Sequence, residues 1–303
     1  MDMVDNRLTH AEVFETLITR VADYLTKYGL KSMVLGVSGG IDSTIVAAIC
    51  HEVSKRTGIP LIGRSLTMKN TDGEIDSSIK VGEAFCDDFK HISLKGEYQL
   101  LLNKLGMDLG MDMQTKIANG NIQARLRMIY LRNLAGVTGG IMMDCDNESE
   151  RWLGFWTIAG DVGDICPTAN LWKHEIYSLA KWLVGYYANQ AIGDNCQKCR
   201  DMADAIMASA KLAPTDGLGI SSSDLEQIGA KSYDDVDDIL CTYINCDEGA
   251  WENHFKVQMY TKYGRDAVDN VIARHKGSAF KMAQLPVRIE IRPGGLKQRE
   301  LFE

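Results

Sequence analysis

Two patterns of apolar and polar positions alternate along the first half of the chain. Short, largely apolar runs predict strands at 32–37 (SMVLGV), 60–66, 89–94 and 140–145. Stretches with apolar residues three or four positions apart predict helices at 11–28, 43–56, 74–86 and 115–135. Strands that alternate with helices in this way are typical of an α/β fold, and we expect a doubly wound parallel sheet.

The pattern changes after Asp146. Helical periodicity then dominates, and loops rich in Gly, Asp and Ser separate the segments. We expect helices at 147–156, 173–187, 197–210, 234–243, 250–263 and 266–275. Residues 1–285 are therefore predicted to form a single domain, a sheet with helical C-terminal additions, and residues 286–303 an extended tail.

Composition narrows the class of protein. The 303 residues are 45% apolar, which is ample for a large core, and the net charge of -8 argues against general nucleic-acid binding. No stretch approaches the roughly 20 apolar residues of a membrane span, and the acidic, polar N-terminus is unlike a signal peptide. We expect a cytoplasmic protein in which most of the eight cysteines are reduced.

The turn after the first predicted strand carries the first chemical signal. It reads SGGIDS over residues 38–43, and ligands bind at such turns beyond the carboxyl ends of parallel strands. Glycines let the backbone approach an anion, serines offer hydroxyls, and the next helix offers free N–H groups. The lysine of a Walker A loop is missing. Asp42, an acid within this anion site, makes sense if a divalent cation bridges it to phosphate. The alternative is a plain turn with a helix cap.

Five separated motifs together resemble one enzyme family. SGGIDS is similar to the pyrophosphate loop of the N-type ATP pyrophosphatases, which share an adenine-nucleotide alpha-hydrolase-like fold and cleave ATP to AMP and pyrophosphate. Four further stretches resemble the NAD synthetases among them: NIQARLRMIYLRNLAG at 121–136, DNESERWLGFWT at 146–157, GDVGDICPTANLWKHEIYSLAKWL at 160–183 and HKGSAFKMAQLP at 275–286. The resemblance covers about residues 10–290, in family order.

The resemblance implies an ammonia-dependent NAD synthetase, a ligase that forms a carbon–nitrogen bond. Such an enzyme uses ATP to adenylate the nicotinate carboxylate of deamido-NAD, and ammonia then displaces AMP. It implies Mg²⁺ and a homodimer packed through the helix over 115–135. The apolar positions expected at that interface are Ile122, Leu126, Ile129, Tyr130 and Leu134.

The resemblance also assigns roles to individual residues. Catalytic roles fall to Asp42, Glu150 and Lys173, with Asp42 and Glu150 as the metal ligands. ATP is expected to contact Gly36, Ser38, Gly39, Gly40, Asp42, Ser43, Arg64, Thr157 and Lys173. Deamido-NAD is expected to contact Asn121, Arg125, Phe155, Trp156, Asp161, Asp164, Thr215, His275 and Lys276.

Some of these residues have structural alternatives. Arg125 and Arg127 would also suit a solvated helix face, and Glu150 would also suit the first turn of a helix, where the dipole favours an acid. The stretch GDVGDICP is one residue shorter than the usual family loop. It therefore leaves open whether Asp161 or Asp164 faces the substrate.

Two rival functions remain open at this point. A tRNA-thiolating or deazapurine-forming enzyme of the same superfamily would use Cys196, Cys199, Cys241 and Cys246 for zinc or sulfur chemistry. A non-catalytic nucleotide-binding module would keep the glycine-rich turn without needing Asp42, Glu150 and Lys173. Only about 30 residues precede the first strand, too few for an amidase domain. We therefore expect free ammonia, or a separate partner, to supply nitrogen.

Overall fold

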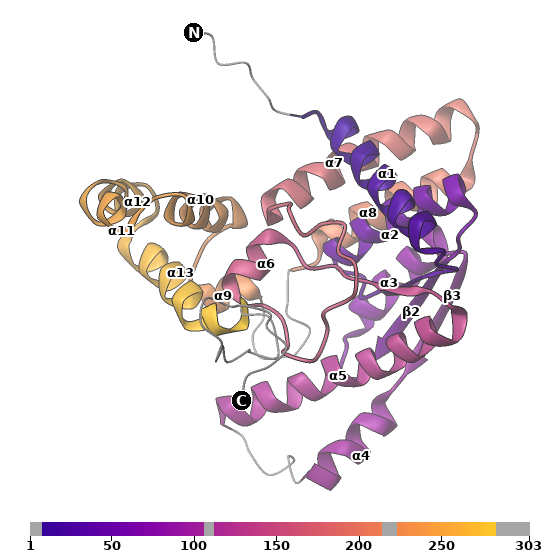
Figure 1. Ribbon diagram of the computed structural model, residues 1–303, viewed down its shortest axis with the longest axis horizontal. Helices are drawn as coiled ribbons and strands as arrows, with labels where there is room; N and C mark the ends of the chain where they lie inside the picture. Colours follow the sequence, from indigo (N-terminus) through magenta and orange to yellow (C-terminus); the bar gives the residue numbers. More distant parts are fainter. Residues whose placement is uncertain (1–7, 106–111, 214–222, 283–303) are drawn as a thin grey trace, which may run out of the picture.

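The computed structural model describes residues 8–105, 112–213 and 223–282, and Figure 1 shows how they are arranged. In this part of the chain, four strands form one parallel sheet in the order β3-β2-β1-β4. The strands are β1 (Met33–Gly36), β2 (Leu61–Thr67), β3 (Asp88–Ser93) and β4 (Ile141–Met143). The predicted doubly wound parallel sheet is thus confirmed.

Helices cover both faces of the sheet. One face carries α1 (His10–Tyr28), α2 (Ile41–Thr57), α3 (Asp72–Phe85), α7 (Lys173–Gly193) and α8 (Gln197–Lys211), and the other carries α4 (Lys95–Leu105) and α5 (Met113–Thr138). Successive side chains of a strand point to opposite faces. Met33 and Leu35 accordingly join the first core, while Val34 joins the second. All three are fully buried, which explains the unbroken apolar run of the central strand.

A second, smaller group of helices stands beside the sheet (Figure 1). It consists of α6 (Glu148–Leu153), α9 (Asp224–Ile228), α10 (Tyr233–Ile244), α11 (Glu248–Ala250), the π-helical turn η2 (Trp251–Phe255), α12 (Lys256–Tyr263), α13 (Arg265–Ser278) and η3 (Ala279–Met282). These helices have their own hydrophobic core, in which Trp251, Leu153, Val236 and Val268 are buried together. The described residues therefore contain three hydrophobic cores, one on each face of the sheet and one among these C-terminal helices.

The predicted helices and strands lie close to the observed ones, with three differences. The helix α4 was not predicted, because it buries only Tyr98 and Leu102 and so has a weak apolar pattern. The short α9 lies at the end of a stretch that we expected to be a loop. The single helix expected over 250–263 is interrupted by η2. The predicted tail over 286–303 falls outside the described residues.

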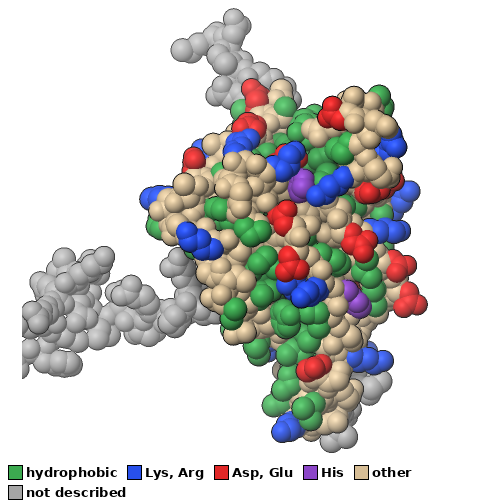
Figure 2. Space-filling view, turned by 90° about the vertical axis from the view of Figure 1, so that its right-hand side faces the viewer, with side chains coloured by type: hydrophobic (Ala, Val, Ile, Leu, Met, Phe, Trp, Pro, Cys, Tyr) green, Lys and Arg blue, Asp and Glu red, His purple; other side chains and the backbone are tan. Residues whose placement is uncertain are grey.

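The surface mixes both signs of charge. On the side that faces right in Figure 1, acidic and basic side chains are interspersed over the described residues (Figure 2). Across the described ranges, no helix is both long and apolar enough to cross a membrane.

Candidate functional site

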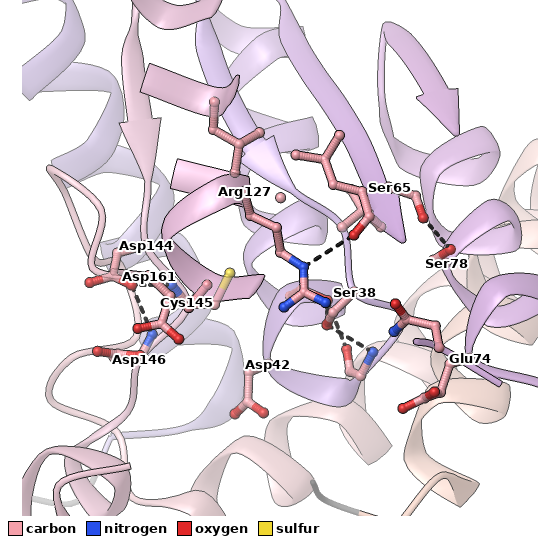
Figure 3. Close-up of a pocket in the computed structure, with 18 of the residues that line it drawn as sticks. Ser38, Asp42, Ser65, Glu74, Ser78, Arg127, Asp144, Cys145, Asp146 and Asp161 are labelled. Atoms are coloured by element: carbon pink, nitrogen blue, oxygen red, sulfur yellow. Dashed lines mark hydrogen bonds between the residues drawn. The ribbon is translucent and has the colours of Figure 1, made fainter. Parts of the chain in front are cut away.

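A cavity of about 480 Å³ opens at the carboxyl ends of the strands (Figure 3). The chain leaves β1 for β2 on one side, while β4 pairs with β1 on the other, so the cavity lies where the strand order reverses. The lining comes from the loop after β1, the end of β2, α5, the turn after β4, and Glu150, Phe155, Asp161, Lys173, Leu212, Ala213 and Asp224. Segments of the sheet, of its covering helices and of the C-terminal helices therefore meet around one hollow.

The SGGIDS turn forms a cradle of donors at one side of this cavity. The hydroxyls of Ser38 and Ser43 lie 2.9 Å apart, and the backbone N–H of Gly40 donates to Ser38 Oγ at 3.2 Å. Gly40 is the N-cap of α2 and makes no side-chain cap bond. The first N–H groups of α2 therefore remain available, together with the positive end of the helix dipole, for an anion in the cavity.

Gly39 is required by the packing of this turn. Its backbone has φ +84°, a conformation that side chains disfavour, and an added Cβ would lie 2.5 Å from the backbone nitrogen of Ser78. Ser77 donates a hydrogen bond to the Gly39 carbonyl at 2.8 Å. The helix α3 is thus pressed directly against the cradle and fixes its shape.

We predict that Gly39→Ala lowers the free energy of unfolding by about 2 kcal/mol or more and sharply weakens ATP binding. The matched control is Gly40→Ala, because Gly40 has φ -74° and its Cβ would meet nothing nearer than Ser38 Oγ at 3.4 Å. Urea denaturation and calorimetric ATP titration measure both effects. Equal stability of the two variants would contradict the packing argument.

A buried lysine joins two carboxylates at the centre of the cavity wall. Lys173 Nζ lies 2.5 Å from Asp42 Oδ2 and 2.9 Å from Glu150 Oε1. The Lys173 side chain is only 2% exposed, so its charge has to be compensated locally. The structure therefore brings together the three residues predicted to be catalytic. Between the two acids predicted to bind metal it shows a shared ammonium group.

Burial and charge shift the protonation of this triad. Burial raises the pKa of Glu150 to about 8, against the opposing effect of Lys173. Burial alone would lower the pKa of Lys173, but the carboxylates of Asp42 and Glu150 outweigh it and raise that pKa well above its ordinary value. The carboxylate charges on either side therefore favour the protonated form of Lys173.

Glu150 has a local structural role as well as its contact with Lys173. It is the third residue of α6 and forms a capping box with Asn147: the Glu150 N–H donates to Asn147 Oδ1 at 3.0 Å, and the Asn147 N–H donates back to Glu150 Oε2 at 3.3 Å. Asn147 Nδ2 also donates to Asp42 Oδ1 at 2.9 Å. Glu150 thus stands in the first turn of a helix, as the structural alternative expected, and also lines the cavity beside Lys173. Asn147, which bonds to both Glu150 and Asp42, was missed by the sequence analysis.

A second buried acid holds the beginnings of α6 and α7 together. Asp237 of α10 accepts hydrogen bonds from the Ser149 hydroxyl at 2.5 Å and from the His174 N–H at 2.9 Å. Ser149 Oγ in turn accepts the Lys173 N–H at 2.8 Å. Because Ser149 precedes Glu150 and His174 follows Lys173, Asp237 positions two of the three triad residues, Glu150 and Lys173, from the C-terminal helices.

We predict that Asp237→Asn lowers the free energy of unfolding by about 1–3 kcal/mol and weakens ATP binding, because an amide NH₂ cannot accept the bonds that the lost oxygen accepted. The neighbouring Asp238 bonds to Lys262 and Tyr263 on the surface instead, so Asp238→Asn is the matched control. Calorimetric ATP titration and urea denaturation of both variants check this. If Asp238→Asn weakened ATP binding as much, the positioning role of Asp237 would be refuted.

Three acids form the wall opposite the cradle. Asp144, Asp146 and Asp161 line the cavity around Cys145 (Figure 3). Burial raises the pKa of Asp144, and burial together with the charge of Asp144 raises the pKa of Asp146 well above its ordinary value. We call these three residues the acid wall. Asp144 and Asp146 were missed, although the run DCDNESE that follows a strand contains the signal.

The remaining predicted ATP contacts are placed unevenly. Gly36 lines the cavity, whereas Thr157 is buried below it and donates its hydroxyl proton to Asn121. Arg64 reaches the lining, but its guanidinium pairs with Asp88 of β3 at 2.8 Å. The arginine that extends into the cavity is Arg127 of α5 (Figure 3), which the sequence analysis interpreted as a possible solvated position.

The loop between α6 and α7 is fastened to α5 by several residues that we expected to contact deamido-NAD. Arg125 donates to the Ile158 carbonyl at 3.2 Å, and Asn121 accepts from Thr157 at 2.8 Å. Asp164 pairs with Arg132 at 2.5 Å. Asp161, in contrast, lines the cavity. Of the two acids left open by the sequence, Asp161 is thus the one at the cavity.

The aromatic and C-terminal candidates also separate. Phe155 lines the cavity, whereas Trp156 packs under Lys281, whose Nζ lies 5.6 Å from the ring centroid. His275 bonds to the Trp152 carbonyl at 2.9 Å, and Lys276 lies over Tyr243; neither lines the cavity. Thr215 lies outside the described residues. Lys281, which donates to the carbonyls of Gly154 and Trp156, was not among the predicted residues. Its only sequence signal was its position shortly before Leu285–Pro286.

The cysteines expected by the zinc-binding rival do not assemble. Within the described ranges, which include all eight cysteines, no three His, Cys, Asp or Glu side chains are placed to hold a metal ion. Cys196 and Cys199 lie together at the start of α8, whereas Cys241 is in α10 and Cys246 follows it. A four-cysteine zinc centre is therefore absent from this part of the structure.

Three comparisons relate the chain to known proteins. The family model described as NAD synthase matches residues 13–285. The chain is 30% identical to the NH(3)-dependent NAD(+) synthetase of Thermoplasma acidophilum over 74% of this chain and 82% of that protein. It is 28% identical to the NH(3)-dependent NAD(+) synthetase of Methanococcoides burtonii over 88% of this chain and 90% of that protein. The solved structure of NMN synthetase from Francisella tularensis has a TM-score of 0.70 at 23% identity, covers 95% of this chain and 100% of its own, and shares the fold.

Proposed function

This chain belongs to the NAD synthase family, and we propose that it is an ammonia-dependent NAD synthetase. The proposed reaction is the ATP-dependent amidation of deamido-NAD, with AMP and pyrophosphate as coproducts. One observation carries the proposal beyond the family: the buried Asp42–Lys173–Glu150 triad stands beside an uncapped helix start in the cavity at the strand reversal. A module that only bound a nucleotide would have no need of this triad.

The residues of the cavity suit both steps of the chemistry. The nicotinate carboxylate attacks the α-phosphorus of ATP, and pyrophosphate leaves. The hydroxyls of Ser38 and Ser43 and the first N–H groups of α2 would hold the departing pyrophosphate. The guanidinium of Arg127 would balance charge that develops on the phosphates. Ammonia then attacks the acyl carbon, and AMP leaves.

The donor set at the triad also fits Mg²⁺. Asp42 and Glu150 both lie within hydrogen-bond distance of one ammonium, so their oxygens face the same space. Carboxylates combined with phosphate oxygens are ligands that Mg²⁺ prefers. A bound Mg²⁺ would neutralise the phosphates as pyrophosphate leaves. In this proposal Asp42 and Glu150 would hold the ion, and Lys173 would keep the two acids in place.

The acid wall suits the nitrogen donor. Ammonia is present in neutral solution mostly as ammonium. Burial raises the pKa of Asp144, Asp146 and Asp161 and so disfavours their charged forms, and an ammonium ion bound among them would restore those forms by compensating their charge. The relatives reported above that carry NH(3)-dependent names match along most of their own length. Both facts support free ammonia as the nitrogen source.

A homodimer and a cytoplasmic location belong to the same proposal. Ile129 of α5 is 67% exposed and Val137 78% exposed, beside a hollow that Leu126, Tyr130 and Leu134 help to line. A second copy packed there would bury this apolar face. Light scattering tests the dimer, because Ile129→Glu should produce monomers while Val257→Glu, at an equally exposed position of α12, should not.

The proposed cytoplasmic location agrees with the state of the cysteines. All eight cysteines are free, as is usual in the cytoplasm.

We predict that purified protein with ATP, Mg²⁺, ammonium and deamido-NAD forms NAD, AMP and pyrophosphate. Glutamine freed of ammonia should not replace ammonium. Chromatographic separation measures all three products. A parallel reaction with the deamidated mononucleotide tests whether NMN is formed instead, the product named for the Francisella tularensis enzyme. Release of ADP, or amidation of the mononucleotide alone, would refute the proposed reaction.

We predict that Asp42→Asn and Glu150→Gln each cost about 3 kcal/mol or more of transition-state stabilisation, because each variant would leave Mg²⁺ with only one of its two carboxylate ligands. The double variant should cost much less than the sum of the two. Glu148→Gln is the matched control, since Glu148 bonds to the Trp152 indole and not to Lys173. Single-turnover AMP formation across a Mg²⁺ titration measures the effect. Additive losses, or an unchanged Mg²⁺ dependence, would show that the two acids share no ion.

A further inference from the structure

The corner between α7 and α8 carries two cysteines that the proposed reaction does not use. Cys196 is the N-cap of α8, and Cys199 lies one turn further along. The Cys199 thiol donates to Cys196 Sγ with a sulfur–sulfur distance of 2.8 Å, and the Cys199 N–H donates to the same sulfur at 3.3 Å. The two sulfurs are therefore in direct contact at the beginning of a 15-residue helix.

The surroundings make the two thiols unequal. The hydrogen bonds from the Cys199 thiol and N–H lower the pKa of Cys196. Burial and the same hydrogen bond raise the pKa of Cys199 to about 11. A helix N-terminus favours a thiolate at the first position of such a pair. Cys196 is thus suited to attack as a thiolate, and Cys199 is held protonated beside it.

The other cysteines differ from this pair in their surroundings. Burial raises the pKa of Cys50, Cys86, Cys145 and Cys166. The first three pack in or beside the core of the sheet, and the Cys166 thiol donates to the Asp146 carbonyl at 2.9 Å. Cys246 is also partly exposed, but its thiol donates to the Tyr243 carbonyl and not to another sulfur. Among the eight cysteines, all within the described ranges, Cys196 and Cys199 are the two whose sulfurs are hydrogen-bonded to each other.

We propose that Cys196 and Cys199 form a thiol–disulfide exchange site that reacts with small disulfides. The Cys196 thiolate attacks one sulfur of the small disulfide, whose S–S bond breaks, and one half leaves as a thiolate. The other half is then joined to Cys196 as a mixed disulfide. Cys199 loses its proton to water and attacks Cys196 Sγ, so that the second half leaves and a Cys196–Cys199 disulfide forms. Two electrons pass from the protein dithiol to the small disulfide, which ends as two thiols after taking up two protons.

The position of the pair makes such a reaction accessible and separates it from the cavity. The corner is open to solvent, since Ile192 beside it is 80% exposed and both cysteines are partly exposed. The cavity lies at the other end of α8, where Leu212 and Ala213 follow the last helical residue. Variants at the corner should therefore leave the basal amidation activity unchanged.

The test treats the reduced full-length protein with oxidised glutathione and follows intact mass and disulfide-mapped peptides. The wild type should form the Cys196–Cys199 disulfide and retain no glutathione. Cys199→Ser should accumulate glutathione on Cys196, because the resolving thiol is gone. Cys196→Ser should form neither product at this corner. Cys246→Ser is the matched control and should behave as the wild type.

The rate gives a second measurement. Under native conditions the wild type should react with dithiodipyridine in a fast phase, roughly tenfold or more faster than the remaining thiols, and Cys196→Ser should lose that phase. Serine is itself a good N-cap, so the variants should fold, which near-UV circular dichroism checks. Glutathione that stays on Cys196 in the wild type, equal trapping by both single variants, or a fast phase that survives Cys196→Ser would overturn the proposal.

Discussion

The buried ammonium of Lys173 is the interaction on which the rest of the site depends. A cation that is 2% exposed is strongly unfavourable unless opposite charges surround it. Its two carboxylate partners come from the loop after β1 and from α6, while Lys173 itself begins α7. Compensation of one charge therefore fixes the phosphate cradle relative to two helices that follow more than 100 positions later in the chain. The geometry of the cavity is a consequence of that pairing.

Three helices begin at this point, and each begins in a different way. The start of α2 is left uncapped for an anion, α6 is closed by the Asn147–Glu150 capping box, and α7 opens with Lys173, where the helix dipole disfavours a cation. The carboxylates of the triad overcome that dipole. Asp237 of α10 then fastens α6 and α7 to the C-terminal helices. The C-terminal helices are thus part of the site, because they hold in place Glu150 and Lys173, which line the cavity.

The sequence predicted what depends on local patterns. The strands, the SGGIDS turn and the strand reversal follow from periodicity and turn chemistry, and the structure shows them. The orientation of side chains was harder to predict: Arg125 and Arg127 lie two positions apart, roughly 200° around a helix, and only the tertiary packing decides that Arg127 enters the cavity. Asp237 and Lys281 were missed for the same reason, since their partners lie far away in sequence.

The order of the strands also places the hydrogen-bond donors of the cavity apart from its acidic side chains. The end of β1 supplies backbone N–H groups and hydroxyls, whose chemistry suits an anion, while the end of β4 supplies Asp144 and Asp146, whose carboxyl groups suit a cation. If both sets of groups followed the same strand, the carboxyl groups would bind the N–H groups and hydroxyls themselves. Because β1 and β4 are neighbours with a crevice above them, the sets face the same volume from opposite sides, with Lys173 in the wall between them. In the proposed reaction, anionic phosphates and a cationic nitrogen donor would then enter one cavity without competing for the same groups.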